Sequence, residues 1–311
     1  MNILVTGGAG FIASHLCDRL LALGHQVAIV DNLTTGKREN LPEDARFHEV
    51  DIRDDGLQRI FRLERPEVVF HHAAHIDVTR SVREPDYDAS VNILGSLNIM
   101  ECCRSNGVRK VVYAGTGGAL YGEPRYLPVD ESHPVDPISP YGVSKHTVEH
   151  YLFAYRANHG MEYTVLRYPN VYGPRQDPHG EAGVVAIFSL QLLSGRQPVI
   201  FGDGTKTRDY CNVIDIVEAN VIALNTPLCG VYNLGRGIEV SDLEIFEAVR
   251  EAVVSETRPA FAAVRPGEIG HIALDASKAR RELGWRWKVD LKEGVAEAVE
   301  FYRAQTERTQ P

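Results

Sequence analysis

Short apolar runs rich in β-branched residues alternate with helical spacing of apolar positions through the first half of the chain. The short runs predict strands at Asn2–Thr6, Gln26–Val30, Phe47–Val50, Val68–Phe70, Lys110–Ala114 and Tyr163–Arg167. The helical spacing predicts helices at Gly10–Leu23, Asp54–Leu63, Asp86–Ser105 and Pro140–Asn158. Alternation of this kind produces a parallel sheet with right-handed crossovers and helices on both faces. We therefore predict an α/β fold with a Rossmann-like, doubly wound parallel sheet.

The regular alternation stops after about Tyr168, where proline and glycine become frequent. The segments that we expect to return to the main sheet are Asp209–Val213, a helix near Asp215–Leu224, and Val231–Leu234. Two further amphipathic helices are predicted at Ser241–Val254 and Leu291–Arg303. We predict a Rossmann domain over residues 1–168, with returning elements near residues 209–236. A smaller C-terminal α/β lobe over residues 169–311 would hold the substrate.

Composition and charge narrow the class of protein. Of the 311 residues, 44% are hydrophobic and 24% are charged, which is ordinary for a globular protein. The net charge of -9 and the lack of a dense Lys/Arg run argue against a nucleic-acid partner. The first residues form a strand-like run rather than a signal peptide, and no apolar stretch approaches the roughly 20 residues that span a bilayer. The five cysteines have neither zinc nor redox spacing, so we expect reduced thiols in a cytoplasmic protein without membrane association.

A glycine-rich turn lies between the first predicted strand and the first predicted helix. Gly7 permits a tight turn, Gly10 lets the backbone approach a pyrophosphate, and Ala13 is an accepted small residue where helix and strand pack closely. Phe11 and Ile12 open the helix, whose free N–H groups and dipole favour an anion. The turn therefore predicts a dinucleotide-binding site.

A residue at the end of the second predicted strand indicates which dinucleotide binds. Asp31 lies about 20 residues beyond the glycines, where a carboxylate accepts hydrogen bonds from a ribose 2′-OH and repels a 2′-phosphate. We therefore predict that the site binds NAD rather than NADP and that Asn32, next to Asp31, contacts the cofactor. Arg38 follows in the same loop and could weaken this preference. Asp51 and Ile52 follow the third strand and are placed to contact the adenine. The alternative for Asp51 is a helix N-cap.

Tyr141 and Lys145 form a Y-x-x-x-K pair within the predicted helix Pro140–Asn158, so they share one helix face. A free tyrosine has a pKa of about 10 and is a poor base at neutral pH. A neighbouring ammonium favours the phenolate and brings the hydroxyl into the range of a working acid or base. The pair is common by chance in helices, but together with a dinucleotide site it predicts a catalytic tyrosine.

Together these motifs resemble the extended short-chain dehydrogenases/reductases, and more narrowly they are similar to the bacterial UDP-glucose (UDP-galactose) 4-epimerases. The similarity extends over essentially the whole chain and is specific for nucleotide-sugar enzymes. The supporting stretches are Asp31–Leu33, Thr116–Glu123, Pro140–Lys145, Arg167–Gln176, Gly202–Tyr210 and Arg265–Glu268.

The resemblance implies three catalytic residues. Tyr141 would remove the proton from the sugar 4-OH while hydride passes from C4 to NAD+, and Lys145 would lower the tyrosine pKa and hold the nicotinamide ribose. Thr116 would hydrogen-bond the sugar O4, with capping of its own backbone as the alternative. The resulting 4-keto sugar would turn and take the hydride back on its opposite face.

The resemblance also implies ligand contacts outside the catalytic residues. These are Asn92 and Tyr168 for the cofactor, and Asn170, Arg208 and Arg265 for the UDP-sugar, with Arg175 as a weaker candidate. Bidentate arginines suit a diphosphate, and a surface salt bridge is the alternative for each. The histidines His71, His72 and His75 follow a buried strand that lines the cofactor in the family, so we predict no metal site.

Departures from the family pattern bear on the reaction. Gly115 stands where many relatives carry serine. Gly117 and Gly118 replace the acidic pair with which 4,6-dehydratases eliminate water, and the glutamate of the decarboxylases is missing too. Ile272 falls, by ungapped counting, where the family has a bulkier gate residue, so we expect tolerance of N-acetylated UDP-hexoses. Epimerases of UDP-glucuronate or UDP-N-acetylglucosamine, and other nucleotide-sugar enzymes of this class, remain alternatives.

Two other classes are disfavoured. A regulator that had lost its chemistry would have a broken Y-x-x-x-K, and Asp31 argues against an NADPH-linked reductase. In the family the helices Asp86–Ser105 and Pro140–Asn158 pair across a two-fold axis, so we expect a homodimer.

Overall fold

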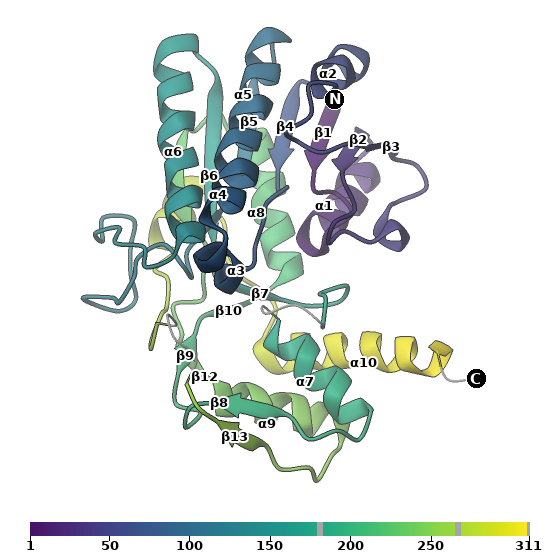
Figure 1. Cartoon of the computed structure of the whole chain (residues 1–311), viewed down its shortest axis with the longest axis vertical. Helices are drawn as coiled ribbons and strands as arrows, with labels where there is room; N and C mark the ends of the chain where they lie inside the picture. Colours follow the sequence, from purple (N-terminus) through teal and green to yellow (C-terminus); the bar gives the residue numbers. More distant parts are fainter. Residues whose placement is uncertain (179–182, 265–268, 310–311) are drawn as a thin grey trace.

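A seven-stranded, all-parallel sheet forms the centre of the protein, in the strand order β11-β6-β5-β4-β1-β2-β3 (Figure 1). The computed structural model describes residues 1–178, 183–264 and 269–309. The strands of the sheet are β1 (Asn2–Thr6), β2 (Gln26–Asp31), β3 (Arg46–Glu49), β4 (Val68–His71), β5 (Lys110–Thr116), β6 (Glu162–Tyr168) and β11 (Gly230–Asn233). The predicted doubly wound α/β fold is therefore confirmed.

The strand order creates a crevice where the chain reverses direction across the sheet. From β1 the chain builds outward to β2 and β3, and it then returns to the other side of β1 through β4. Thr6, the last residue of β1, pairs with Val30 on one side and with His71 on the other. The segments that follow these strands therefore leave the sheet side by side, and ligands bind at this switch point in such sheets.

Helices cover both faces of the sheet. On one face α1 (Phe11–Ala22) and α8 (Val213–Asn225) contribute to one apolar core. On the other face α2 (Leu57–Glu64), α5 (Ser96–Ser105) and α6 (Pro140–His159) enclose a second core. Figure 1 shows α5 and α6 together in front of the strands and α8 behind them. This burial on both sides explains why the strands are continuous apolar runs instead of alternating ones.

The predicted helix Asp86–Ser105 has an irregular middle. It comprises α4 (Pro85–Ala89), a π-helical turn η2 (Ser90–Gly95) and α5, in one uninterrupted course. Such π turns are frequent at functional sites, because they shift the helix register and redirect side chains. Here the turn contains Asn92, one of the residues predicted to bind the cofactor.

A second lobe lies below the carboxyl ends of the strands in Figure 1. Its core is formed by α7 (Val184–Leu193), α9 (Asp242–Val253) and α10 (Leu291–Thr309). Two-stranded sheets complete it, formed by β7 (Asn170–Tyr172) with β10 (Tyr210–Asn212), β8 (Val199–Phe201) with β13 (Ala260–Ala262), and β9 (Thr207–Arg208) with β12 (Val240–Ser241). The remaining short helices are α3 (Val78–Arg83), η1 (Arg38–Asn40) and η3 (Ala279–Leu283).

The structure corrects one predicted strand and adds one helix. Asp209–Val213 was expected to return to the main sheet, but β10 pairs with β7 in a separate sheet, while α8 and β11 do return. The sequence of α7, VVAIFSLQLL, is apolar on almost every side, so it has no helical periodicity to detect.

All five cysteines are free thiols, and four of them are buried. No helix within the described ranges combines the length and the apolar character that crossing a membrane requires.

Candidate active site

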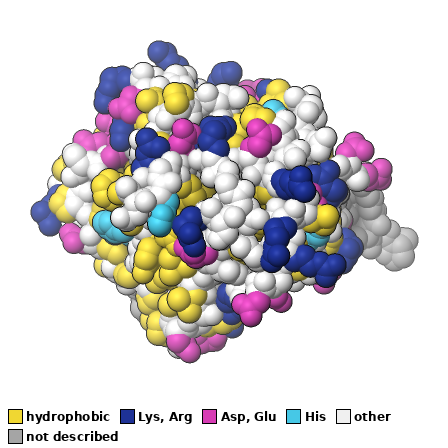
Figure 2. All heavy atoms as spheres, turned by 90° about the horizontal axis from the view of Figure 1, so that it is seen from above, with side chains coloured by type: hydrophobic (Ala, Val, Ile, Leu, Met, Phe, Trp, Pro, Cys, Tyr) yellow, Lys and Arg dark blue, Asp and Glu magenta, His cyan; other side chains and the backbone are white. Residues whose placement is uncertain are grey.

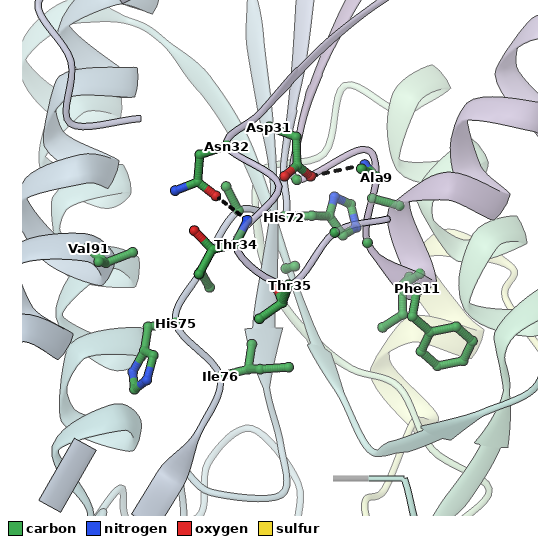
Figure 3. A pocket seen from close by; sticks show the side chains of 18 of the residues that line it. Ala9, Phe11, Asp31, Asn32, Thr34, Thr35, His72, His75, Ile76 and Val91 are labelled. Carbon is green, nitrogen blue, oxygen red and sulfur yellow. Dashed lines mark hydrogen bonds between the residues drawn. The ribbon is translucent and has the colours of Figure 1, made fainter. Parts of the chain in front are cut away.

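A cavity of about 440 Å³ opens at the switch point between β1 and β4 (Figure 3). Its walls come from the loops after β1, β2, β3 and β4, from the end of β5 and from α6. Eleven of the predicted cofactor-binding residues line it, namely Gly7, Gly10, Phe11, Ile12, Asp31, Asn32, Asp51, Ile52, Tyr141, Lys145 and Tyr168. Residues spread over most of the first half of the sequence therefore meet around one cavity.

The glycine-rich turn has the shape of an anion cradle. Gly7 has a φ of +72°, and a Cβ on it would lie 2.7 Å from the backbone nitrogen of Ala73, so no other residue fits. Gly10 precedes α1 in an extended conformation, and no side chain caps the helix. The first N–H groups of α1 are thus left for a ligand at the edge of the cavity, as a pyrophosphate requires.

The carboxylate of Asp31 is held by two backbone groups. Its oxygens accept hydrogen bonds from the backbone nitrogens of Ala9 (3.0 Å) and Leu33 (2.8 Å), as Figure 3 shows for Ala9. Desolvation is the larger effect and raises the pKa of Asp31, while the two N–H donors act against it. The carboxylate therefore lies at the cavity wall in a fixed orientation, as the preference for NAD demands.

Asp51 is anchored to its neighbours and does not cap a helix. Arg53 binds it through Nε and Nη2, both at 2.8 Å, and Asn32 donates a third hydrogen bond at 2.8 Å. The hydrogen bonds from Arg53 hold the pKa of Asp51 well below its usual value. Helix α2 begins only at Leu57, with Gly56 as its N-cap, so the capping alternative for Asp51 is wrong.

The Y-x-x-x-K pair lies in the first two turns of α6. Ser139 caps this helix by accepting a hydrogen bond from the backbone nitrogen of Gly142 (3.2 Å). The Lys145 side chain is buried, and its Nζ lies 4.4 Å from the centre of the Tyr113 ring. Tyr141 hydrogen-bonds Thr116, the last residue of β5. The three predicted catalytic residues are therefore adjacent.

The protonation behaviour of the pair differs from the sequence-based expectation. Desolvation raises the pKa of Tyr141 to about 12, the hydrogen bond with Thr116 lowers it, and the nearby charge of Asp88 raises it further. Desolvation also lowers the pKa of Lys145 to about 7, against the opposing charges of Glu149 and Asp88. Desolvation of Tyr141 therefore outweighs the effect of the neighbouring Lys145 in the ligand-free protein.

A buried ion pair lies next to Lys145, one helical turn further along α6. Glu149 lies one turn after Lys145 and receives hydrogen bonds from Arg167 Nε (3.0 Å) and Nη2 (2.6 Å). Arg167 also donates to the hydroxyl of Tyr121 (2.7 Å). Burial acts to raise the pKa of Glu149, but hydrogen bonds from His146 and Arg167 keep it below its usual value. Neither residue was singled out from the sequence, although the four-residue spacing from Lys145 to Glu149 was a usable signal.

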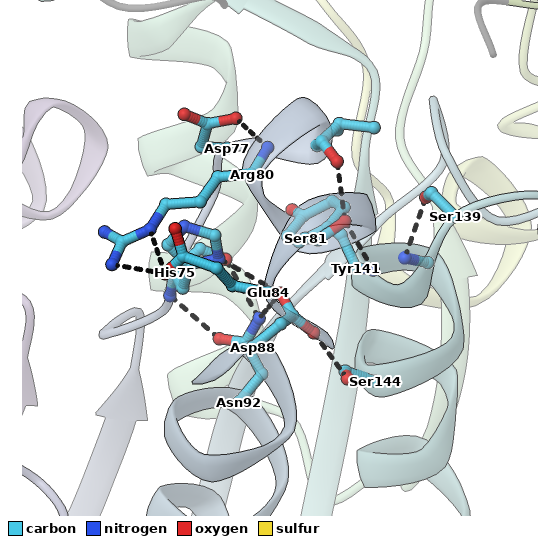
Figure 4. Close-up of polar contacts among 12 residues, drawn as sticks. His75, Asp77, Arg80, Ser81, Glu84, Asp88, Asn92, Ser139, Tyr141 and Ser144 are labelled. Carbon is cyan, nitrogen blue, oxygen red and sulfur yellow. Dashed lines mark hydrogen bonds and ion pairs between the residues drawn. The ribbon is translucent and has the colours of Figure 1, made fainter. Parts of the chain in front are cut away.

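Asn92 supports the cavity wall rather than lining it. Its Oδ1 accepts a hydrogen bond from the backbone nitrogen of His75 (2.8 Å), and its Nδ2 donates to the His75 carbonyl (2.9 Å) and to Asp88 (2.9 Å) (Figure 4). The π turn η2 therefore fixes the loop that follows β4. Asp88 accepts another hydrogen bond, at 2.6 Å, from Ser144, the neighbour of Lys145.

Two of the three histidines at and after the end of β4 are neutral and paired within the protein. His71 bonds Thr6 through Nδ1 (2.7 Å) and Ser96 through Nε2 (2.8 Å), and His72 bonds the Tyr168 hydroxyl at 3.0 Å. Desolvation, with the nearby charge of Lys145, lowers the pKa of both rings to about 3. Among residues 1–178, 183–264 and 269–309, no group of three or more His, Cys, Asp or Glu side chains is arranged to hold a metal ion.

Residues predicted to bind substrate lie toward the second lobe. Thr116 also accepts a hydrogen bond from the backbone nitrogen of Ala119 (3.3 Å), so its local capping role is present alongside the contact with Tyr141. Asn170 begins β7, and its Oδ1 lies 3.4 Å from where a Cβ on Gly118 would stand. A Cβ at position 118 would therefore be in contact with Asn170, and the glycine leaves that contact unmade.

The predicted diphosphate arginines differ in their surroundings. Arg208 donates to the backbone carbonyls of Thr207 (2.7 Å) and Ile269 (2.9 Å), so it is held in place with no carboxylate among these partners. Arg175 borders the cavity and pairs with Asp18 at 2.7 Å, which fits its salt-bridge alternative. Arg265 lies outside the described residues.

Ile272 and Gly115, which also depart from the family pattern, both lie in tightly packed surroundings. Ile272 is almost fully buried in a small apolar cluster with Leu120 and Tyr121, away from the residues that line the cavity. Gly115 borders the cavity, and a Cβ there would lie 3.0 Å from Val165, so the missing serine coincides with tight packing behind the wall.

Comparison with known proteins agrees with this geometry. The sequence profile of the NAD dependent epimerase/dehydratase family matches residues 3–235, and the chain belongs to this family. A UDP-glucose 4-epimerase from Mycolicibacterium smegmatis is 47% identical over 309 residues, which cover 97% of this chain and 99% of that protein. The NAD dependence of the family fits the open cradle, the oriented Asp31 and the unpaired buried nitrogens His72 Nδ1 and His75 Nε2 in the residues around the cavity.

Two solved structures share the whole architecture. A UDP-glucose 4-epimerase from Thermotoga maritima, determined with UDP-glucose, has a TM-score of 0.96 and 47% identity, covering 98% of this chain and 100% of that one. A UDP-glucose 4-epimerase from Thermus thermophilus, determined with NAD, has a TM-score of 0.93 and 47% identity, covering 97% of this chain and 99% of that one.

The lowered pKa of Lys145 predicts a pH-dependent effect on the stability of the NAD-free protein. Its pKa is near 10.5 ordinarily and about 7 in the folded protein. Between these values the unfolded chain binds more protons, so this residue makes stability rise with pH across the window, and its cost is largest below pH 7. We expect Lys145→Met to raise the free energy of unfolding by about 3 kcal/mol more near pH 6.5 than near pH 9.5.

The measurement is urea denaturation of the NAD-free protein at both pH values. Lys292→Met is the matched control, because Lys292 is largely exposed and should give no such difference. An equal effect of Lys145→Met at the two pH values would contradict the proposed cost of the buried ammonium.

Proposed function

We propose that this protein is an NAD-dependent UDP-glucose 4-epimerase, which interconverts UDP-glucose and UDP-galactose by inverting C4 of the sugar. The observation that carries the proposal is the meeting of Thr116, Tyr141 and Lys145 beside a cavity with the features of an NAD site. The near full-length identity to UDP-glucose 4-epimerases supports it. Inversion through a ketone needs one acid/base group and one hydride acceptor, and this site provides for both.

Tyr141, Thr116 and Lys145 each have a separate role in the reaction. NAD, when bound, supplies the hydride acceptor and donor. Tyr141 takes the proton of the sugar 4-OH through its phenolic oxygen and returns it later in the cycle. Thr116 orients that proton through its hydrogen bond with Tyr141. Lys145 donates hydrogen bonds at the nicotinamide end, and its ammonium, to the extent that it is protonated, favours the phenolate of Tyr141.

The two parts of the chain serve different ligands in this proposal. Residues 1–168, with the returning β11, bind NAD through the cavity residues already described. Residues 169–311 bind the UDP-sugar, with Asn170 at the sugar and Arg208 and Arg265 at the diphosphate. The fixed guanidinium of Arg208 and its location beyond β7 support this division, because a preorganised arginine suits a diphosphate.

The direct test is incubation of the purified protein with UDP-glucose and no added NAD or reductant. We expect UDP-galactose to appear in the proton NMR spectrum, because the cofactor is regenerated in each cycle. Tyr141→Phe should lower kcat by about 10²–10⁴ while the purified protein keeps its NAD, since it removes only the acid/base group. Tyr113→Phe is the control, because Tyr113 is buried beside Lys145 and has no role in proton transfer.

Absence of UDP-galactose from a folded, NAD-containing protein would contradict the proposal and would favour UDP-glucuronate or an N-acetylated sugar as substrate. Full activity of Tyr141→Phe would exclude the assigned acid/base residue.

We also propose that the enzyme accepts N-acetylated UDP-hexoses. The support is the sequence position of the gate residue, where Ile272 stands in place of the bulkier side chain of the family. We expect kcat/KM for UDP-N-acetylglucosamine to lie within roughly 100-fold of that for UDP-glucose, equivalent to about 2.7 kcal/mol in transition-state binding. A larger discrimination against the acetylated sugar, measured with both substrates under one set of conditions, would contradict this tolerance.

We propose a homodimer that forms through α6 and the helical course of α4, η2 and α5, and a cytoplasmic location in keeping with five free thiols. Large apolar side chains on the outer surface of η2 and α6 support the interface, namely Leu94, Val143, Tyr151 and Phe153. Figure 2 shows hydrophobic side chains gathered at the lower left of the face seen from above. Burying such a surface against a second copy removes it from water.

Sedimentation velocity tests the dimer. Leu94→Glu should convert the protein to monomers, because it places a charge in the interface while the 61% exposed side chain is not needed for folding. Val254→Glu, at an exposed position in the second lobe, is the control and should leave the mass unchanged. A wild-type protein that sediments as a monomer would exclude the interface.

A further inference from the structure

The carboxylate of Asp209 is buried between β9 and β10, on the side of the second lobe that faces the main sheet (Figure 1). The residue is only 1% exposed. Its Oδ1 accepts a hydrogen bond from the backbone nitrogen of Arg236 (3.0 Å), and its Oδ2 accepts from the backbone nitrogens of Gly237 (2.9 Å) and Leu274 (3.1 Å). One side chain therefore joins two segments that are far apart in the sequence.

The segment that contains Leu274 also surrounds the predicted diphosphate arginine. The guanidinium of Arg208 donates to the backbone carbonyl of Ile269 at 2.9 Å and to that of Gly270 at 3.3 Å. Residues 269–274 therefore hold Arg208 at one end and are anchored by Asp209 at the other. The orientation of the guanidinium depends on where this segment lies.

The other contacts of Asp209 also lead to the predicted substrate site. Residues 235–237 connect β11 of the main sheet to β12, which pairs with the strand that carries Arg208. The backbone carbonyl of Asp209 accepts a hydrogen bond from the backbone nitrogen of Asn170 (2.9 Å), the residue predicted at the sugar. Asp209 is thus the point at which these parts of the site are fixed to one another.

The packing around this carboxylate is tight. A Cβ on Gly235 would lie 2.6 Å from Oδ2 of Asp209 and 2.8 Å from the Cβ of Leu274, so the glycine permits the close approach. Desolvation raises the pKa of Asp209, while its backbone donors and the nearby charge of Arg236 act to lower it. A buried carboxylate is costly unless donors satisfy it, so the two segments are held together around it.

A second buried carboxylate provides a comparison. Asp215, in α8, is 3% exposed and accepts hydrogen bonds from the backbone nitrogens of Lys288 (2.9 Å) and Val289 (3.1 Å). Desolvation raises its pKa as well, against the same kind of backbone donors. Its partners lie just before α10 rather than in the segments that Asp209 joins. Asp215 therefore matches Asp209 in burial and bonding but not in location.

We propose that Asp209 is a positioning residue for the diphosphate of the UDP-sugar, because it fixes residues 235–237 and 269–274 in the arrangement that orients the Arg208 guanidinium. Bidentate binding of a diphosphate depends on the direction of the planar guanidinium. The buried carboxylate acts through Arg208 and not by touching the substrate. This inference rests on the proposed binding of a UDP-sugar and adds a residue that the sequence patterns did not single out.

Asp209→Asn tests this role with little change in size. An amide has one oxygen, so its NH2 group must face at least one of the backbone nitrogens, and that hydrogen bond is lost. We expect the Kd of the NAD-containing protein for UDP, measured by calorimetry, to rise about 10-fold. The KM for UDP-glucose should rise similarly while kcat changes less than about threefold, since the diphosphate is bound equally in the ground state and the transition state.

Asp215→Asn is the matched control. It should lower the Tm about as much as Asp209→Asn does, because it also disturbs hydrogen bonds to buried backbone nitrogens. Its Kd for UDP should stay within about twofold of the wild-type value, as expected for independent sites. Both variants should retain NAD as the wild type does.

Two further comparisons show whether the effect passes through Arg208. Uridine lacks the diphosphate, so Asp209→Asn should leave its Kd, measured by ligand-observed NMR, within about twofold of the wild-type value. In an Arg208→Met background, Asp209→Asn should change the Kd for UDP by less than about twofold, because the group through which it acts is gone.

A Kd for UDP that Asp209→Asn leaves unchanged would overturn the proposal. Equal losses for UDP and uridine, or fully additive effects of the Arg208 and Asp209 substitutions, would overturn it too. If Asp209→Asn does not fold, Gly235→Ala makes the same test, because its Cβ displaces the same carboxylate, and an unchanged Kd for UDP would again count against the role. A wild-type protein that does not bind UDP would instead contradict the proposed function, so the two failures are distinguishable.

Discussion

The burial of the Lys145 ammonium in the wall of the cavity is the constraint on which the rest of the site depends. A buried lysine loses its charge unless carboxylates lie close to it. Glu149 and Asp88 supply that charge, and each must itself be held by donors, Arg167 in one case and Ser144 with Asn92 in the other. One buried cation therefore determines contacts on α4, η2, α6 and β6.

The parallel sheet brings these groups to one place. Because β1 lies between β2 and β4, the segments that follow these three strands lie side by side at one edge of the sheet. They carry Gly7, Asp31 and His72. Thr116 ends β5 at that edge and meets Tyr141 at the start of α6. The register of parallel strands thus converts positions far apart in the sequence into one cavity.

The main sheet and most of the cavity wall could be predicted from the sequence, because strand runs, glycine spacing and the Tyr141–Lys145 pair are local patterns. The supporting carboxylate of Asp88 could not, since Asp88 resembles a solvated helix residue until the fold places it against Ser144. The pairing of β10 with β7 escaped prediction for a similar reason, because short strands carry no signal for their partner. The roles of individual site residues, including Arg208 and Ile272, stay predictions.

The pKa values of Tyr141 and Lys145 describe the protonation state of the site before ligands bind. Tyr141, with a pKa of about 12, is a neutral phenol at physiological pH, and Lys145, at about 7, contributes only part of a charge. A nearby positive charge is therefore needed to bring Tyr141 into the range of a working base. The nicotinamide ring of oxidised NAD would place a positive charge near Tyr141, which would favour its phenolate. The same burial that raises the pKa of Tyr141 would also strengthen that interaction, because it excludes water from between the two charges.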